Sequence, residues 1–214
     1  MESTQPAVHF DLWDSLKDPA SFLADDRANP ARARAAALVR DERQRLGGRA
    51  TMMEIGCCNG YDYEDFFSKM AELDYLGIDG SSTLVTYCQN RWAPAVFALG
   101  TFGSLSTFKA APWDITYAKA VFEHQEDFQV PLEQLLFVTK RLCIINWYLP
   151  PAIEAKLGFN DSAKMFYNRY AAGAVKQTIR EASFDLTTEL SPSGNELYIC
   201  RKPARVKTRG KTRK

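Results

Sequence analysis

The hydrophobic and polar positions of the chain follow two alternating patterns, short apolar runs and stretches whose apolar residues lie three or four positions apart. Short apolar runs predict buried strands, and the wider spacing predicts amphipathic helices. The predicted strands are 51–55, 75–81, 95–99, a fourth within 112–121, 141–148, 184–190 and 196–201. Five strands that alternate with helices, followed by a hairpin, predict an α/β fold with a mostly parallel sheet.

Helices are predicted between these runs. Asn29 and Pro30 are typical of a helix start, because Asn accepts from first-turn amides and Pro has the φ that the first turn needs. This helix is expected to reach residue 46, before a Gly-Gly pair. The other predicted helices are 61–70, 82–91, 131–140 and 160–182. In the first of these, Asp62 is expected to cap the free amides.

The first 26 residues show no clean period, although Phe10, Trp13 and Phe22 supply apolar surface. Two interpretations stay open for this segment, a strap wrapped on the core and a lid over a substrate. We divide the chain into an N-terminal helical extension (1–48), a single domain (49–201) and a basic tail (202–214), which we expect to be disordered.

Composition and charge narrow the class of protein. Hydrophobic residues make up 46% of the 214 positions, which suits one ordinary domain with a full core. Residues 201–214 hold eight Lys or Arg and no acid, whereas the other 200 residues carry 19 basic and 26 acidic ones. The tail therefore allows a weak nucleic-acid contact.

Targeting and redox signals are few. Residues 1–30 contain acids and no continuous apolar block, so no signal peptide is expected, and no uncharged stretch suits a membrane span. Five cysteines without Cys-x-x-Cys spacing favour reduced thiols in a cytoplasm. The sequence does not indicate an oligomeric state.

The strand at 51–55 runs directly into the loop Gly56-Cys57-Cys58-Asn59-Gly60, and a predicted helix follows. The amino end of such a helix attracts anions and polar ligands. A dinucleotide fingerprint needs Gly-x-Gly-x-x-Gly, but here Cys58 replaces the second glycine, and Tyr61 or Asp62 stands at the third. We therefore do not expect NAD to bind.

The second strand ends at Asp79, 19 residues beyond Gly60 and just before Gly80 and Ser81. At this spacing a carboxylate lies at the end of the neighbouring parallel strand and can accept both hydroxyls of a ribose. The alternative is an Asp that caps the helix starting at residue 82.

Together these residues resemble the first two motifs of class I S-adenosylmethionine-dependent methyltransferases, an acid before Gly-x-Gly-x-Gly and a second acid one strand later. Glu54, Gly56, Gly60 and Asp79 match, and Cys58 departs from the pattern. Residues 112–127 resemble the fourth-strand segment of the same family, including its hydrophobic-Glu-His step.

The resemblance covers about residues 50–200. It implies a three-layer α/β/α Rossmann-like fold, a seven-stranded sheet in the order 3-2-1-4-5-7-6 with the seventh strand antiparallel, and S-adenosylmethionine as the cofactor. The residues expected to bind this cofactor are Glu54, Gly56, Cys57, Cys58, Gly60, Asp79, Gly80, Ser81, Thr101, Phe102 and Ala118. Thr101 stands where many members have an acid that reaches the adenine, and Phe102 is expected to stack on that ring instead.

The acceptor is expected over the ends of the fourth and fifth strands. The residues placed there are Lys119, Glu123, His124, Asn146, Trp147 and Tyr148. Lys119, Glu123 and His124 are the catalytic candidates, with His124 as a base suited to neutral pH or, alternatively, a plain helix-start histidine. No metal is expected, because Ala120 replaces the first acid of a Glu-x-x-Glu-His motif and leaves two ligands.

These expectations favour a methyltransferase that acts on a small molecule, at oxygen rather than nitrogen. Two alternatives remain, an RNA- or ribosome-associated methyltransferase that uses the basic tail, and a non-catalytic protein that binds the cofactor.

Overall fold

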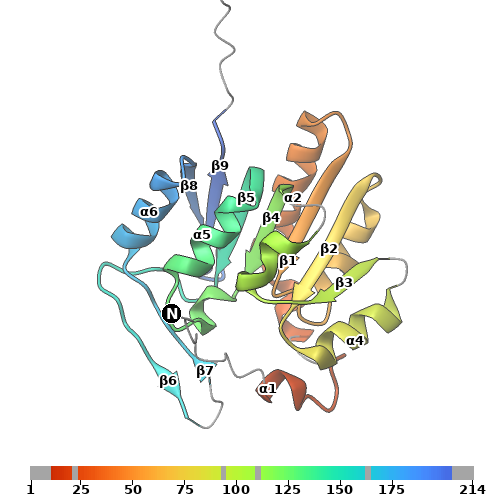
Figure 1. The fold of residues 1–214 in the computed structure, drawn as a ribbon, viewed down its shortest axis with the longest axis horizontal. Helices are drawn as coiled ribbons and strands as arrows, with labels where there is room; N and C mark the ends of the chain where they lie inside the picture. Colours follow the sequence, from red (N-terminus) through yellow and green to blue (C-terminus); the bar gives the residue numbers. More distant parts are fainter. Residues whose placement is uncertain (1–10, 21–23, 93–94, 109–111, 162–164, 204–214) are drawn as a thin grey trace, which may run out of the picture.

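The computed structural model describes residues 11–20, 24–92, 95–108, 112–161 and 165–203, and its centre is a seven-stranded sheet in the order β3-β2-β1-β4-β5-β9-β8 (Figure 1). The parallel strands are β1 (Ala50–Ile55), β2 (Leu73–Asp79), β3 (Val96–Leu99), β4 (Trp113–Lys119) and β5 (Thr139–Trp147). β9 (Glu196–Arg201) pairs antiparallel with β5 and with β8 (Asp185–Leu190). The predicted fold class and strand order are confirmed, with β8 and β9 as the sixth and seventh strands of the sheet.

Helices cover both faces of this sheet (Figure 1). They are α2 (Pro30–Arg45), α3 (Tyr61–Asp65) and α4 (Ser82–Arg91) on one face, and α5 (Gln129–Phe137) and α6 (Ala172–Glu181) on the other. Neighbouring strand residues alternate between the two layers: Met52 packs with the α2 side and Met53 with the α5 side. The period of two along each strand therefore builds two cores and three layers.

The helix at α2 starts as the sequence predicts. The Asn29 side chain accepts a hydrogen bond from the Ala31 amide at 3.0 Å, and Pro30 occupies the first turn. The helix ends at Arg45, one residue before the expected end. Its Ala35 and Val39 are fully buried, so this part of the predicted N-terminal extension packs into the sheet layer.

The predicted helix at 61–70 is wrong in its length and in its cap. α3 ends at Asp65, the backbone leaves the helical conformation at Phe66, and a separate 3-10 turn, η2, covers Phe67–Lys69. Gly60 takes the capping position with no side-chain hydrogen bond. Asp62 does not cap the helix, because its carboxylate forms ion pairs with Arg32 and Lys119.

The predicted helix at 160–182 is wrong in its first half. β6 (Phe159–Asn160) and β7 (Met165–Phe166) form a small antiparallel hairpin there, and α6 begins only at Ala172. Asn168 holds the returning strand, since its amide donates to the Glu123 carbonyl and its side chain donates to the Gln125 carbonyl. We call residues 156–170 the flap.

The boundary between the fourth helix and the fifth strand also differs from the expectation of a helix to residue 140. β5 already begins at Thr139, whose hydroxyl donates to the Leu135 carbonyl at 2.7 Å and contacts the Thr116 hydroxyl at the same distance. These two contacts turn the chain into the sheet directly after α5.

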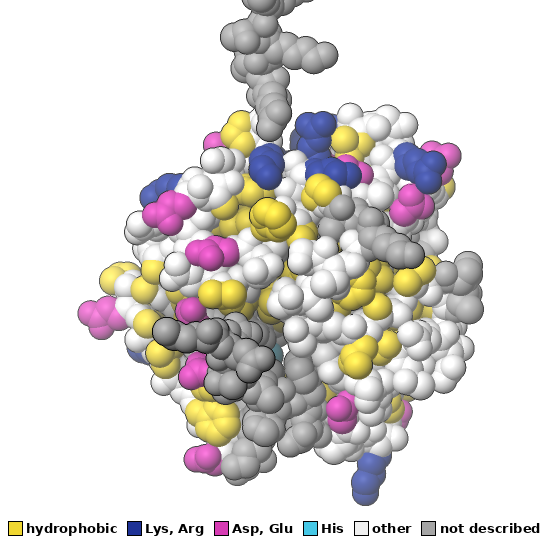
Figure 2. All heavy atoms as spheres, viewed as in Figure 1, with side chains coloured by type: hydrophobic (Ala, Val, Ile, Leu, Met, Phe, Trp, Pro, Cys, Tyr) yellow, Lys and Arg dark blue, Asp and Glu magenta, His cyan; other side chains and the backbone are white. Residues whose placement is uncertain are grey.

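The two ends of the sheet differ in charge. Figure 2 shows most of the visible Lys and Arg side chains near the end of the molecule where β9 finishes, while acidic and apolar side chains prevail at the opposite end. The Lys202 amide donates to the Arg141 carbonyl, so the described chain is still tied to β5 at this point. The tail from residue 204 onward lies outside the described residues. Within the described ranges, no helix is long and apolar enough to cross a membrane.

Candidate functional site

Most of the predicted site residues lie along one edge of the sheet, where the parallel strands end. In the register of the sheet, Ile55 pairs with Ile78 of β2 and with Ala118 of β4, so the residues that follow these three strands meet at this edge. In open α/β sheets, ligands bind at this edge and at the point where the strand order reverses, here between β1 and β4.

The loop from Gly56 to Gly60 turns sharply after β1. Both glycines have a φ of 73°, in the left-handed region that residues with a Cβ adopt only with strain. A Cβ on Gly56 would overlap Val121, and a Cβ on Gly60 would overlap the Trp92 ring. Cys58 adopts a φ of 53° without being a glycine. Cys58, which replaces the second glycine of the motif, therefore keeps the left-handed backbone conformation of that position.

Asp79 ties this loop to the end of β2. Its carboxylate accepts from the Cys58 amide at 2.8 Å and from the Ser81 amide at 2.9 Å. Burial raises its pKa, and these amides oppose that shift. A carboxylate has about four acceptor sites, so these amides leave part of its capacity for a ligand. The alternative, an Asp79 cap on α4, is not observed, because the Ser81 hydroxyl accepts from the Leu84 amide.

The cysteines of the loop act as packing groups. The thiol of Cys57 is buried beside Cys88, and that contact together with burial raises its pKa. The Cys88 thiol donates to the Cys58 carbonyl at 3.3 Å. The five cysteines are free thiols. Raised thiol pKa values argue against reactive thiolates at this loop.

The N-terminal segment crosses the site, with α1 (Asp11–Asp14) and the 3-10 turn η1 (Ala24–Ala28) at its two ends. The Asp14 carboxylate accepts from the Ser81 hydroxyl at 2.7 Å and from the Thr83 amide at 3.2 Å. The Asn59 side chain donates to the Pro19 carbonyl at 3.1 Å. The described part of this segment therefore lies over the loop and the β2 end, a position that a strap and a lid would share.

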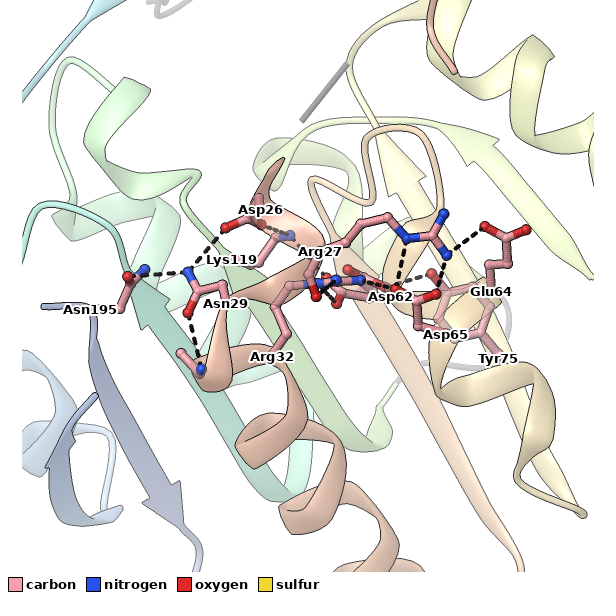
Figure 3. A network of polar contacts seen from close by, with 12 residues as sticks. Asp26, Arg27, Asn29, Arg32, Asp62, Glu64, Asp65, Tyr75, Lys119 and Asn195 are labelled. Carbon is pink, nitrogen blue, oxygen red and sulfur yellow. Dashed lines mark hydrogen bonds and ion pairs between the residues drawn. The ribbon is translucent and has the colours of Figure 1, made fainter. Parts of the chain in front are cut away.

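A buried ion-pair network lies beneath the loop (Figure 3). Arg32, 1% exposed, pairs through Nε with Asp62 at 2.7 Å and through a terminal nitrogen with Asp65 at 2.9 Å. Asp62 also contacts the Lys119 amine at 3.2 Å, and these two cations hold its pKa below the ordinary value despite burial.

Glu54 lies next to this network. Its carboxylate accepts from the Tyr75 hydroxyl at 2.7 Å. Burial and the negative charge of Asp62 raise its pKa well above the ordinary value. The acid of the first motif is therefore joined to β2 through a hydrogen bond rather than exposed to solvent.

The catalytic candidates lie at and just after the end of β4, and each has its own partners. Lys119 pairs with Asp26 at 2.8 Å and with Asp62, so its amine has two carboxylate partners. Glu123 is buried, and its Oε1 accepts from the Tyr148 and Leu149 amides at 2.6 and 3.0 Å.

Glu123 has an unusual protonation equilibrium. Burial raises its pKa to about 7 against the opposing amide hydrogen bonds. Its second oxygen, Oε2, is buried and has no hydrogen-bond partner among the described residues. Glu123 therefore changes charge near neutral pH.

His124 lies between two aromatic rings. Its ring meets Trp13 of α1 edge-on at 6.0 Å and Tyr167 of the flap at 5.4 Å between centroids. Its Nδ1 lies 2.9 Å from the Phe166 carbonyl. Because a carbonyl only accepts, Nδ1 carries the proton in the neutral ring, and Nε2 is the basic nitrogen. Burial lowers the pKa of His124 and favours this neutral form.

Several predicted site residues lie elsewhere. Phe102 is buried against Phe122, with the ring centroids 4.9 Å apart, so it packs in the core, and its stacking on an adenine stays a prediction. Trp147 is fully buried and packs on Phe122 and Tyr198, which excludes it from the acceptor. Thr101 instead forms a capping box with Ser104.

Asn146, expected near the acceptor, is fully buried, and its Oδ1 accepts from Asn195 at 3.3 Å. By contrast Tyr148 is 62% exposed at the end of β5. Within the described ranges, no group of three or more His, Cys, Asp or Glu side chains is placed to hold a metal ion.

Four residues of the site have no signal in the sequence. Asp14, Asp26 and Arg32 reach it from the N-terminal segment and α2, and Tyr75 reaches Glu54 from β2. Each is one of many ordinary charged or aromatic positions. A charged residue at a helix start such as Arg32 becomes notable only when its buried partner is known.

The sequence and the fold are similar to those of known methyltransferases. Residues 53–142 match the model of a family described as methyltransferase domain. Burkholderia thailandensis 1,6-didemethyltoxoflavin-N1-methyltransferase, solved with 1,6-didemethyltoxoflavin and S-adenosylhomocysteine, has a TM-score of 0.65 at 17% identity over 86% of this chain and 82% of its own. No curated protein matches the chain in sequence.

Two further solved structures are similar. The magnesium protoporphyrin IX methyltransferase of Synechocystis, with bound S-adenosylmethionine, has a TM-score of 0.64 at 15% identity and covers 91% of each chain. An amino pentose methyltransferase from Micromonospora echinaspora has a TM-score of 0.63 at 9% identity, over 82% of this chain and 91% of its own. At such identities the likeness to these structures shows the shared fold.

Proposed function

We propose that this chain is a class I S-adenosylmethionine-dependent methyltransferase that methylates a small molecule at a hydroxyl oxygen, with His124 as the base. The match to the methyltransferase domain over residues 53–142 and the fold shared with solved methyltransferases support the cofactor and the class of reaction. The residues at the edge of the sheet fit the cofactor chemically. Asp79 offers acceptor sites to ribose hydroxyls, and the loop between Gly56 and Gly60 together with Ala118 lines the place where the cofactor is expected. When bound, S-adenosylmethionine supplies a methyl group whose bond to sulfur breaks with its electron pair left on sulfur.

The observation that carries the proposal is the environment of His124. Its Nδ1 is occupied by the Phe166 carbonyl, so Nε2 is the nitrogen that can take a proton. A hydroxyl oxygen becomes a good nucleophile as it loses its proton, whereas a neutral amine attacks through an existing lone pair. A neutral imidazole beside the acceptor therefore favours oxygen.

The enclosure of His124 favours a small acceptor. Trp13 contacts it from the N-terminal segment and Tyr167 contacts it from the flap. Two separate parts of the chain thus enclose one imidazole. A polymer would need an open groove at this place, whereas a small molecule needs only a pocket with few polar groups.

Glu123 and Lys119 take different parts in this proposal. Glu123 positions the chain after β5, because it holds the Tyr148 and Leu149 amides next to the acceptor side. Lys119 has two carboxylate partners, so its amine is a poor base, and its proposed part belongs to the cofactor.

The second candidate, methylation of RNA through the basic tail, has weaker support. The described chain leaves β9 beside the first residues of β5, since Arg201 pairs with Leu142. This is the edge of the sheet opposite the site. A tail that starts there is poorly placed to present RNA to His124.

The test uses purified protein, methyl-labelled S-adenosylmethionine and a fractionated cell extract. We expect the label to appear as a methoxy group on a low-molecular-weight compound. His124→Asn should lower turnover at least about 10²-fold while cofactor affinity stays within about twofold, because the base acts only in the transition state. The wild-type rate should rise with pH through the lowered His124 pKa, and the variant rate should not. Label on RNA, or on nitrogen with undiminished turnover in the variant, would contradict the proposal.

A further inference from the structure

A small cavity lies where the loop, the start of α3, the end of β4 and η1 meet. Its volume is about 10 Å³, roughly what one water molecule needs. Asp26, Arg32, Asp62 and Lys119 are among the side chains that line it. The cavity is therefore small and strongly charged, and the N-terminal segment forms one of its walls through Asp26.

The two cations of this cavity differ in how firmly their partners are fixed. Arg32 uses all three nitrogens, on Asp62, on Asp65 and on the Arg27 carbonyl, and it is 1% exposed. Lys119 keeps one buried partner, Asp62, and takes its second from the N-terminal segment, Asp26, whose side chain is 27% exposed. The Asp26 contact is thus the one that can open without leaving Lys119 unpaired.

The end of S-adenosylmethionine opposite its adenine is an amino acid, with a carboxylate and an ammonium group. That carboxylate has the same chemistry as the Asp26 side chain, and an amine in a partly buried place needs an anion in either case. The cavity adjoins the Gly56–Gly60 loop through Cys57 and Cys58. It therefore lies beside the strand-end loop that the first motif marks.

We infer that Lys119 anchors the carboxylate of the amino-acid end of the cofactor, and that the Asp26–Lys119 ion pair is a latch which cofactor binding exchanges for that carboxylate. This inference rests on the assignment of S-adenosylmethionine as the cofactor. Without the cofactor, the Asp26 carboxylate pairs with the Lys119 amine. When the cofactor binds, its carboxylate takes this place and the Asp26 side chain moves away. Asp62 keeps its contacts with Lys119 and Arg32 in both states.

In the latch, the Asp26 carboxylate competes with the cofactor carboxylate for the Lys119 amine. Removal of the Asp26 charge removes the competitor while the anchor stays, so affinity for a ligand with the carboxylate rises. Removal of the Lys119 charge removes the anchor, so affinity for that ligand falls. A ligand without the amino-acid end senses neither change.

The experiment measures calorimetric binding of two probes to the full chain: S-adenosylhomocysteine, which has the amino-acid end, and 5′-methylthioadenosine, which lacks it. Asp26→Asn should bind S-adenosylhomocysteine about two- to fivefold more tightly, the range of a partly exposed ion pair. Lys119→Met should bind it about 10- to 100-fold more weakly, the range of a charge-assisted hydrogen bond. Affinity for 5′-methylthioadenosine should stay within about twofold in both.

Glu64→Gln is the matched control. Glu64 belongs to the same network through Arg27 and Arg91 but does not line the cavity, so neither probe should change. If Lys119→Met does not fold, Asp26→Asn decides alone, because it leaves Lys119 paired with Asp62.

Unchanged or weaker binding of S-adenosylhomocysteine to Asp26→Asn would overturn the latch, as would an equal change for both probes. Failure of both probes to bind the wild-type protein would instead overturn the cofactor assignment.

Discussion

The edge of the sheet that holds the site has two halves, and different interactions close them. Over the ends of β1 and β2, charged groups of the N-terminal segment and α2 meet charged or hydroxyl groups of α3 and of the residues after β2. Examples are the pairs Arg32–Asp62 and Asp14–Ser81. Over the ends of β4 and β5, aromatic contacts and hydrogen bonds to the backbone close the site, as between His124 and the flap residues Phe166 and Tyr167.

The difference agrees with what the proposed function asks each half to bind. A charged ligand that is the same in every turnover suits fixed charges, whose desolvation is offset by well-placed partners. In the proposed function the acceptor loses a proton in the second half, where Glu123 has a pKa raised by burial to about 7 and His124 has a pKa lowered by burial. We therefore expect stability to depend on charge pairs in the first half and on pH in the second.

The largest expected effect is in the first half. Asp62→Ala would leave Arg32 with one carboxylate fewer and Lys119 with Asp26 alone, in a place where Asp62 is 4% exposed. Removing one partner of a buried ion pair costs about 3–5 kcal/mol of the free energy of unfolding. Urea unfolding measures this loss.

The control for Asp62→Ala is Asp74→Ala, because Asp74 pairs with Arg49 at the exposed surface. Its loss should stay within about 0.5 kcal/mol. Equal losses in the two variants would show that the buried network does not hold the first half together.

The next effect is a pH dependence in the second half. The pKa of Glu123 is raised by burial to about 7, so the folded state keeps a proton that the unfolded state has lost. Its stabilising contribution is complete below about pH 4.5 and disappears as the pH rises through 7, a change of about 3 kcal/mol.

Glu123→Gln should therefore lose less stability than the wild type between pH 4.5 and 8, by about 3 kcal/mol in urea titrations at each pH. The comparison between the two proteins cancels the titration of other groups. Asp62 makes a useful contrast, since its lowered pKa gives stability that is lost only as the pH falls below its ordinary range. Parallel pH profiles for wild type and Glu123→Gln would remove Glu123 as the titrating group.

The sequence predicts the first half better than the second. The strands, the loop and Asp79 follow from local periods and from a motif within a few residues, and local patterns survive folding. The strand order follows from the resemblance to the methyltransferase family. Asp14 and Asp26 were missed, because they reach Ser81 and Lys119 across 67 and 93 positions. The pairing of charges over such separations depends on how the chain is laid across the sheet, which no local pattern contains.

An apolar residue near the site looks the same in sequence whether it faces a ligand or the core. Phe102 and Trp147 were assigned to the site, yet both pack on Phe122 in the core. The helical spacing at 160–182 also predicts the wrong structure for its first half, because long-range contacts decide the conformation there. Hydrogen bonds of Asn168 to the Glu123 and Gln125 carbonyls outweigh a local periodicity in the first half of that stretch.

The smallest expected effect compares one contact of the N-terminal segment from each half by double-mutant cycles. Arg27 pairs with Asp65 at a site where the side chains are 38% and 22% exposed, and Trp13 meets His124 edge-on. The first coupling should be about 0.2–1 kcal/mol and the second about 0.5–1 kcal/mol. At about 1 M salt, where the screening length is about 3 Å, the Arg27–Asp65 coupling should fall toward zero while the Trp13–His124 coupling stays, because ring contacts owe little to net charge. Unfolding of the single and double alanine variants in low and high salt measures both. If both couplings fell together, the two halves would be closed by the same kind of interaction, and the contrast between a charged cofactor side and an aromatic acceptor side would be lost.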